Sequence, residues 1–81
     1  MNETKLSKPS IDWSHVSDKF NCLARDYDGS VYLYEKKPEM GDDSWSPRTS
    51  AWGDVISAAA FKSLDAGNCD WAESLVERPK N

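Results

Sequence analysis

Residues 20–34 read FNCLARDYDGSVYLY, and this stretch predicts a β-hairpin. Its first part, Phe20 to Arg25, alternates side chains with the two-residue period of an extended strand. Its last part, Val31 to Tyr34, is rich in the β-branched and aromatic residues that strands favour. Asp28-Gly29 stands between them and is a strong turn signal, because glycine takes a positive φ without a Cβ clash. We therefore expect two antiparallel strands joined at Asp28-Gly29.

The second strand should end near Lys37, because Pro38 has no N–H to donate to a strand ladder. A third strand is expected downstream, over Ala51 to Ile56, with Ser44 to Arg48 as the alternative. Together with the hairpin, this gives an antiparallel sheet of about three strands.

Two later segments have helical features. The stretch Ser57 to Leu64 is rich in alanine and predicts a helix, with a strand continuing through Ala60 as the alternative. Between Asp70 and Glu77 the apolar residues recur one helical turn apart, and Asp70 with Glu73 forms a capping box. We therefore expect a helix over Asp70 to Glu77, with Trp71 and Leu75 on its buried face. The predicted fold class is α+β, with short helices packed on the sheet.

The beginning of the chain divides at Pro9. Residues 1–9 are polar and predict a flexible arm, while residues 10–79 predict a single globular domain. At the start of that domain, Ser10 or Asp12 can cap one helical turn that brings Trp13 and Val16 to the core side.

The chain has 81 residues, with 14 acidic and 10 basic side chains and a formal net charge of −4. This length suits one domain. No apolar run approaches the ~18 residues of a transmembrane helix, and the polar start predicts no signal peptide.

With only two cysteines, Cys22 and Cys69, we expect reduced thiols and at least one buried, with a single disulfide as the alternative.

Three segments resemble small phage and prophage accessory proteins. They read IDWS at 11–14, YLYEKKP at 32–38 and CDWAESLVERP at 69–79, and such proteins typically show an IDW opening, a YEKxP-like exit from an aromatic strand and a DWxxSLxxRP close. The resemblance implies a phage origin and a small antiparallel sheet with short helices. It implies no particular activity, and residues 45–64 match least.

The residues give little support to catalysis or metal binding. His15 lies beside Ser14 and near Asp12, but neighbours in one turn point in different directions and form no catalytic triad. Zinc needs four closely spaced ligands, and His15, Cys22 and Cys69 are scattered. The sequence therefore predicts no catalytic residue, no metal and no cofactor.

Nucleic-acid binding is disfavoured by the negative charge, because phosphate contacts supply most non-specific affinity. Lys36-Lys37 is the only adjacent basic pair. Tyr32 and Tyr34 share one strand face and could stack bases, although stacking sites also need neighbouring cations. We expect neither direct nucleic-acid binding nor membrane binding.

Protein binding explains the composition best, because four tryptophans and three tyrosines are many for so small a core, and aromatic side chains anchor interfaces. The candidate partner-binding residues are Asp42, Asp43, Trp45, Trp52, Asp54, Tyr32 and Tyr34. The acidic, aromatic stretch from Glu39 to Asp54 suits a basic groove on a host protein that normally holds nucleic acid. The alternative is that the tryptophans close the core and the aspartates only solubilise a loop.

Together with the resemblance to phage accessory proteins, these features predict a noncatalytic accessory protein that acts in the cytoplasm of a bacterial host. The resemblance implies that its partner is a host protein or complex, such as a nuclease, a polymerase or a CRISPR-type defence complex, which it would inhibit as an anti-defence factor. The expected oligomeric state is a monomer or weak homodimer. The alternative function is phage structure or assembly through self-association.

Overall fold

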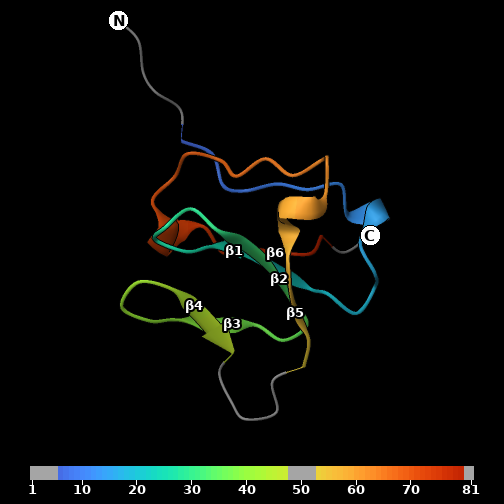
Figure 1. The fold of residues 1–81 in the computed structure, drawn as a ribbon, viewed down its shortest axis with the longest axis horizontal. Helices are drawn as coiled ribbons and strands as arrows, with labels where there is room; N and C mark the ends of the chain where they lie inside the picture. Colours follow the sequence, from blue (N-terminus) through green and yellow to red (C-terminus); the bar gives the residue numbers. More distant parts are fainter. Residues whose placement is uncertain (1–5, 48–52, 80–81) are drawn as a thin grey trace, which may run out of the picture.

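The computed structural model describes residues 6–47 and 53–79 (Figure 1). In chain order, its elements in those ranges are η1 (Trp13–His15), β1 (Cys22–Arg25), β2 (Val31–Tyr34), β3 (Pro38–Met40), β4 (Trp45–Pro47), β5 (Val55–Ser57), η2 (Ala58–Ala60), η3 (Trp71–Glu73) and β6 (Val76–Glu77). Strands dominate, and each η element is a single turn of 3-10 helix. No helix in the described ranges is long and apolar enough to span a bilayer.

The predicted hairpin is confirmed. Strands β1 and β2 pair antiparallel with Arg25 opposite Val31, and the Asp26 N–H donates to the Ser30 carbonyl at 2.8 Å. The Gly29 N–H donates to the Asp26 carbonyl at 2.9 Å, and Gly29 takes a φ of 95° while Asp28 does not enter the positive-φ region. This is a type I turn followed by a left-handed glycine, one of the common hairpin connections.

The hairpin forms the centre of a four-stranded antiparallel sheet in the order β5-β2-β1-β6. A separate two-stranded hairpin, β3-β4, lies beside it (Figure 1). The expected third strand over Ala51 to Ile56 overlaps β5 only at its end, and residues 48–52 lie outside the described ranges. The alternative over Ser44 to Arg48 overlaps β4. Pro38 begins β3 rather than interrupting a strand, as proline's missing N–H allows.

The predicted α+β class is wrong in its helical part, first at Ser57 to Leu64. Strand β5 ends at Ser57, so the alternative of a strand through Ala60 is also wrong. The Ser57 hydroxyl caps η2 by accepting the Ala59 N–H, and Phe61 is already extended. Beyond it, the backbones of Ser10 and Asp65 exchange two hydrogen bonds of 2.8 Å. The chain after η2 therefore pairs with the amino-terminal segment instead of continuing a helix.

The predicted helix over Asp70 to Glu77 is also wrong. Only η3 forms there, and the Asp70 side chain makes no capping hydrogen bond. Chain direction then changes at Ser74, and β6 pairs with β1 by placing Val76 opposite Leu23. Sheet pairing and the contacts of a buried serine outweigh the local helical pattern, as tertiary context often does.

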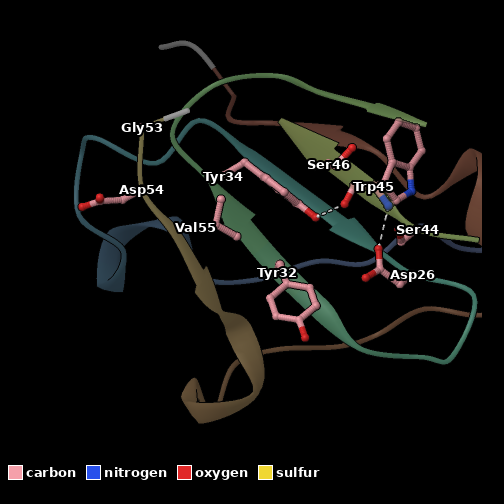
Figure 2. Close-up of a pocket in the computed structure, with 9 residues that line it drawn as sticks. All are labelled: Asp26, Tyr32, Tyr34, Ser44, Trp45, Ser46, Gly53, Asp54 and Val55. Atoms are coloured by element: carbon pink, nitrogen blue, oxygen red, sulfur yellow. Dashed lines mark hydrogen bonds between the residues drawn. The ribbon is translucent and has the colours of Figure 1, made fainter. Parts of the chain in front are cut away.

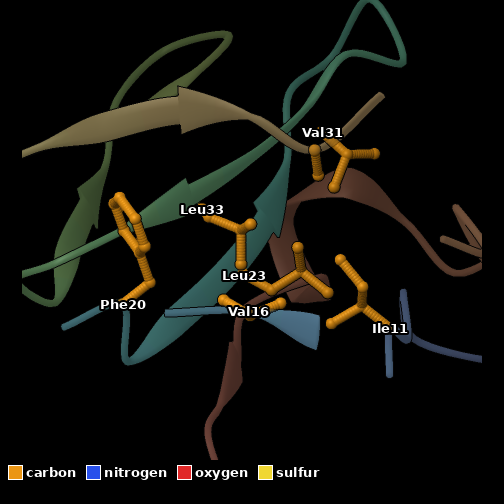
Figure 3. Close-up of a cluster of buried hydrophobic side chains, with 7 residues drawn as sticks. Ile11, Val16, Phe20, Leu23, Val31 and Leu33 are labelled. Atoms are coloured by element: carbon orange, nitrogen blue, oxygen red, sulfur yellow. The ribbon is translucent and has the colours of Figure 1, made fainter. Parts of the chain in front are cut away.

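The hydrophobic core covers both faces of the four-stranded sheet, because successive side chains in a strand point to opposite sides. One face carries Ile11, Val16, Phe20, Leu23, Val31, Leu33 and Ala58 (Figure 3). The other carries Cys22, Ala24 and Tyr34, with Tyr32, Trp45 and Leu75 packed against them. Trp13 is half-buried against the first face, and Asp12 is the cap of η1. Both cysteines are buried free thiols.

The amino-terminal segment lies along residues 67–69. The Ser7 carbonyl accepts the N–H groups of Asn68 and Cys69 at 2.9 and 3.0 Å, and Pro9 is buried. Gly67 has a φ of 72°, and a Cβ there would lie 2.5 Å from the Ser7 carbonyl oxygen. The division into an arm over 1–9 and a domain over 10–79 stays a prediction.

Candidate protein-binding surface

A groove of about 520 Å³ lies between the β4 segment and the face of β2 and β5 (Figure 2). We call it the aromatic groove, and the residues that line it are Asp26, Tyr32, Tyr34, Ser44, Trp45, Ser46, Gly53, Asp54 and Val55. Its volume lies within the ~300–1,000 Å³ that is usual for ligand pockets. The groove is therefore large enough to receive a side chain or short segment of a partner.

The strand register places the apolar side chains of the groove. Tyr32 and Tyr34 project from the same face of β2, since they are two residues apart, and Val55 of β5 lies opposite Tyr34. Tyr34 is 2% exposed, so almost none of its side chain is accessible to a partner. Burial raises the pKa of the Tyr34 phenol well above its ordinary value of 10.0, which keeps it a hydrogen-bond donor.

Side chains from the four-stranded sheet hold both backbone groups of Trp45. The Asp26 carboxylate accepts the Trp45 N–H at 2.8 Å, and the Tyr34 hydroxyl donates to the Trp45 carbonyl at 3.1 Å (Figure 2). Satisfied backbone groups keep a strand end in place. One wall of the aromatic groove is thus fixed to the opposite one.

Asp26 is the partly buried carboxylate of this site, and it immediately follows β1. Burial raises the pKa of Asp26 above its ordinary 3.8, the hydrogen bond from the Trp45 N–H opposes that rise, and the nearby charges of Asp28 and Asp43 add to it. No lysine or arginine is among the described residues that line the groove. The group is consequently a negative charge with little local compensation.

Asp26 also lines a second, smaller depression. We call it the acidic hollow, and its lining residues are Asp26, Tyr27, Asp28, Asp43 and Ser44. The Tyr27 N–H donates to the Asp43 carbonyl at 3.0 Å, which ties the loop before β4 to the β1-β2 turn. The two depressions share Asp26 and Ser44 and so lie next to each other.

Three aromatic rings pack edge to face beside the acidic hollow. The Trp71 ring centroid lies 6.4 Å from that of Tyr27 and 6.5 Å from that of Trp45. The Trp45 indole N–H donates to the Trp71 carbonyl at 3.1 Å. Tyr27 is 73% exposed, so this aromatic cluster reaches from the interior to the surface.

Several basic side chains of the described ranges are occupied elsewhere. The Arg25 guanidinium donates to the carbonyls of residues 66, 67 and 69, and Arg78 donates to those of residues 13, 16, 17 and 20. Lys19 pairs with Asp54, and Lys37 pairs with Glu77. None of these cations lines the aromatic groove or the acidic hollow.

The structure brings together most of the predicted partner-binding residues. Tyr32, Tyr34, Trp45 and Asp54 line the aromatic groove, and Asp43 lines the acidic hollow. Asp42 is exposed in the adjoining loop. Trp52 lies outside the described residues.

Asp26, Tyr27 and Val55 were not among the predicted site residues. The hairpin pattern assigned Asp26 and Tyr27 to a turn, and that assignment gave no indication of the neighbouring loop. An acidic residue directly after a strand whose side chains alternate is the one local signal that could have pointed to Asp26.

His15 lies away from this surface. It is exposed, and its Nδ1 is 3.7 Å from an Asp12 carboxylate oxygen. The hydroxyl and N–H of Ser14 both donate to Asp12, and the hydroxyl bond is the main reason why the pKa of Asp12 is lowered. In the described ranges, no three histidine, cysteine or acidic side chains gather closely enough to hold a metal ion.

Comparison with protein-family models, with curated proteins and with solved structures gave no match.

Proposed function

We propose that this chain is a noncatalytic phage accessory protein that binds a basic surface of a bacterial host protein. The observation that carries the proposal is that the acidic hollow and the aromatic groove lie side by side and share Asp26. The resemblance of residues 11–14, 32–38 and 69–79 to phage and prophage accessory proteins supports the same conclusion. Nucleases, polymerases and CRISPR-type complexes of the host cytoplasm are suitable targets, since their nucleic-acid grooves are basic.

The chemistry of the surface suits a protein partner. Tyrosine and tryptophan bury large areas at low entropic cost and are enriched among the residues that dominate binding energies. Carboxylates around them steer a basic partner and raise the association rate. Tyr27, Trp45 and Trp71 supply the first property, and Asp26, Asp28, Asp42 and Asp43 supply the second.

The surface is also preorganised. The Tyr27 N–H to Asp43 carbonyl bond and the Trp45 N–H to Asp26 bond hold the loop before β4 against the hairpin turn. A loop that is already ordered loses less conformational entropy on binding. The acidic side chains are therefore presented at fixed positions rather than on a free loop.

Quantitative capture from host lysate tests the proposal. The parent chain, the Asp42→Lys/Asp43→Lys variant and an Asp18→Lys/Glu77→Lys control are immobilised, and bound proteins are measured by mass spectrometry. The control makes the same change in net charge, and Glu77 lies opposite Cys22, at the other end of β1 from Asp26. We expect a basic protein retained by the parent and the control and lost by the loop variant. Equal retention by all three would reject the surface.

One observation favours self-association as a second candidate. Strand β5 is at the edge of the four-stranded sheet, and Val55 and Ile56 are 37% and 38% exposed. Exposed apolar edge strands pair readily with other chains. A sedimentation series over protein concentration separates the two functions, because assembly through β5 predicts growing oligomers that Ile56→Lys abolishes, whereas the binding function predicts a monomer or weak dimer.

A further inference from the structure

We propose that the aromatic groove receives an arginine side chain of the partner, with its guanidinium on the Asp26 carboxylate and its aliphatic stem along Tyr32 and Val55. This inference rests on the binding function proposed above and specifies the chemistry of the residue recognised. It concerns the groove rather than the loop that carries Asp42 and Asp43.

Charge complementarity indicates that the side chain bound in the groove is positively charged. The groove contains two carboxylates, Asp26 and Asp54, and its described lining has no basic residue. Asp54 is already paired with Lys19. Asp26 uses Oδ1 to accept the Trp45 N–H, and no ion pair joins it to a cation of the described ranges. A cation of the partner would therefore form an ion pair with Asp26 rather than with Asp54.

The apolar part of the lining distinguishes arginine from other cations. Tyr32 and Val55 offer a ring and aliphatic surface between Asp54 and Asp26 (Figure 2), while Tyr34 is buried beneath them. A guanidinium is planar, stacks on aromatic rings and is more weakly hydrated than an ammonium, so it enters such a site at lower cost. It can also donate two parallel hydrogen bonds to one carboxylate.

The acidic hollow next to the groove indicates that this arginine belongs to a protein. Asp28 and Asp43 lie just beyond Asp26 in the acidic hollow, where further basic residues of the same partner can rest. The negative charges of Asp28 and Asp43 also raise the pKa of Asp26, and a bound cation would reduce that repulsion. One anchored arginine inside a basic partner surface fits both depressions together.

Three pentapeptides with capped ends test the inference on the full chain. Each has two glycines on either side of a central residue, which is arginine, citrulline or lysine. Binding is followed by NMR through the Trp45 indole N–H and the amides of Asp26, Tyr32 and Val55. We expect these signals to shift with the arginine peptide. Citrulline keeps the shape but lacks the charge, so it should bind at least about tenfold more weakly, as the loss of a charge-assisted hydrogen bond predicts. Lysine should bind several-fold more weakly than arginine.

Asp26→Asn is the matched variant, because an amide oxygen can still accept the Trp45 N–H while the charge is removed. It should weaken the arginine peptide by about tenfold or more. The control is Asp65→Asn, since Asp65 likewise accepts a backbone N–H, from Gly67, and lies outside both depressions. The control should leave the affinity unchanged.

Equal binding of arginine and citrulline, or parental affinity in Asp26→Asn, would overturn the inference. Equal binding of lysine would overturn the assignment to a guanidinium. Host-protein capture separates this failure from that of the proposed function. Capture that Asp26→Asn retains and Asp42→Lys/Asp43→Lys loses rejects only the arginine site, whereas capture retained by both variants rejects the binding surface as well.

Discussion

The Asp26 carboxylate accepts the backbone N–H of Trp45 at 2.8 Å, and this bond joins the end of β1 to the start of β4. The partners are 19 residues apart in the chain. The bond connects the four-stranded sheet to the β3-β4 hairpin and places a negative charge where the aromatic groove meets the acidic hollow. The Tyr34 hydroxyl bond to the Trp45 carbonyl and the Tyr27 N–H bond to the Asp43 carbonyl hold the same elements together.

Asp26→Asn should be at least as stable as the parent at pH 7. Burial raises the folded-state pKa of Asp26 above its ordinary 3.8, so the folded state binds a proton more tightly than the unfolded state does, and ionisation of Asp26 opposes folding. The variant's advantage should shrink as pH falls through the folded-state pKa and vanish below about 3.8. Urea unfolding of both proteins at pH 7, 5 and 3.5 measures the difference. A variant clearly less stable than the parent at pH 7 would show that the charged hydrogen bond is a net stabiliser.

Gly29→Val should lower the free energy of unfolding by about 1 kcal/mol or more, because a β-branched residue is strained at positive φ. No atom lies within 4 Å of the position that a Cβ would take, so the loss comes from the backbone alone. Asparagine tolerates left-handed geometry better, and Gly29→Asn should lose less. Thermal or urea unfolding checks the order. An unchanged midpoint for the valine variant would contradict the turn.

Ser74→Ala should cost about 1–3 kcal/mol, the usual penalty for leaving a buried polar group without a partner. Ser74 is fully buried. Its hydroxyl accepts the Arg25 N–H at 2.9 Å and lies within hydrogen-bond distance of the Arg25 and Trp71 carbonyls.

Ser63→Ala is the matched control for that change. The Ser63 hydroxyl also accepts a backbone N–H, from Asp12, but at an exposed position where water can replace it. Its loss should stay within about 0.5 kcal/mol. Equal losses in the free energy of unfolding for the two variants, measured with urea, would mean that the Ser74 hydroxyl does not stabilise the end of β1.

Leu23→Ala should destabilise the chain more than Leu75→Ala. Leu23 is fully buried, and truncation at such a site costs about 2–5 kcal/mol. Leu75 is half-buried at the edge of the second core face, so it leaves a smaller cavity. Denaturant midpoints of both variants give the order. A larger loss for Leu75→Ala would contradict the position of Leu75 at the edge of the second core face.

The elements that the sequence predicts correctly depend on local interactions. The alternation before Asp28-Gly29 and the conformational freedom of Gly29 act within a few residues, and they are enough to specify β1, β2 and their turn. The Asp12 cap of η1 is equally local. Each of these features can be recognised without knowing what packs against it.

The elements that it predicts wrongly are decided by distant partners. Trp71 is held by its edge-to-face contacts with Tyr27 and Trp45, and Val76 lies in register with Leu23. The same apolar spacing that suits a helix therefore serves a turn followed by a strand. Asp26 was missed for the same reason, since its role depends on a backbone N–H in a segment that no local pattern places beside it.

The association rate of the captured host protein tests the central claim most directly. At about 0.1 M salt the Debye length is about 10 Å, so the acidic side chains still steer a basic partner. The account predicts that Asp42→Lys/Asp43→Lys slows association by about tenfold or more, through reversed steering. The Asp18→Lys/Glu77→Lys control should associate at close to the parental rate, and added salt should slow the parent. A loop variant that associates as fast as this control, with no salt dependence in the parent, would contradict the account.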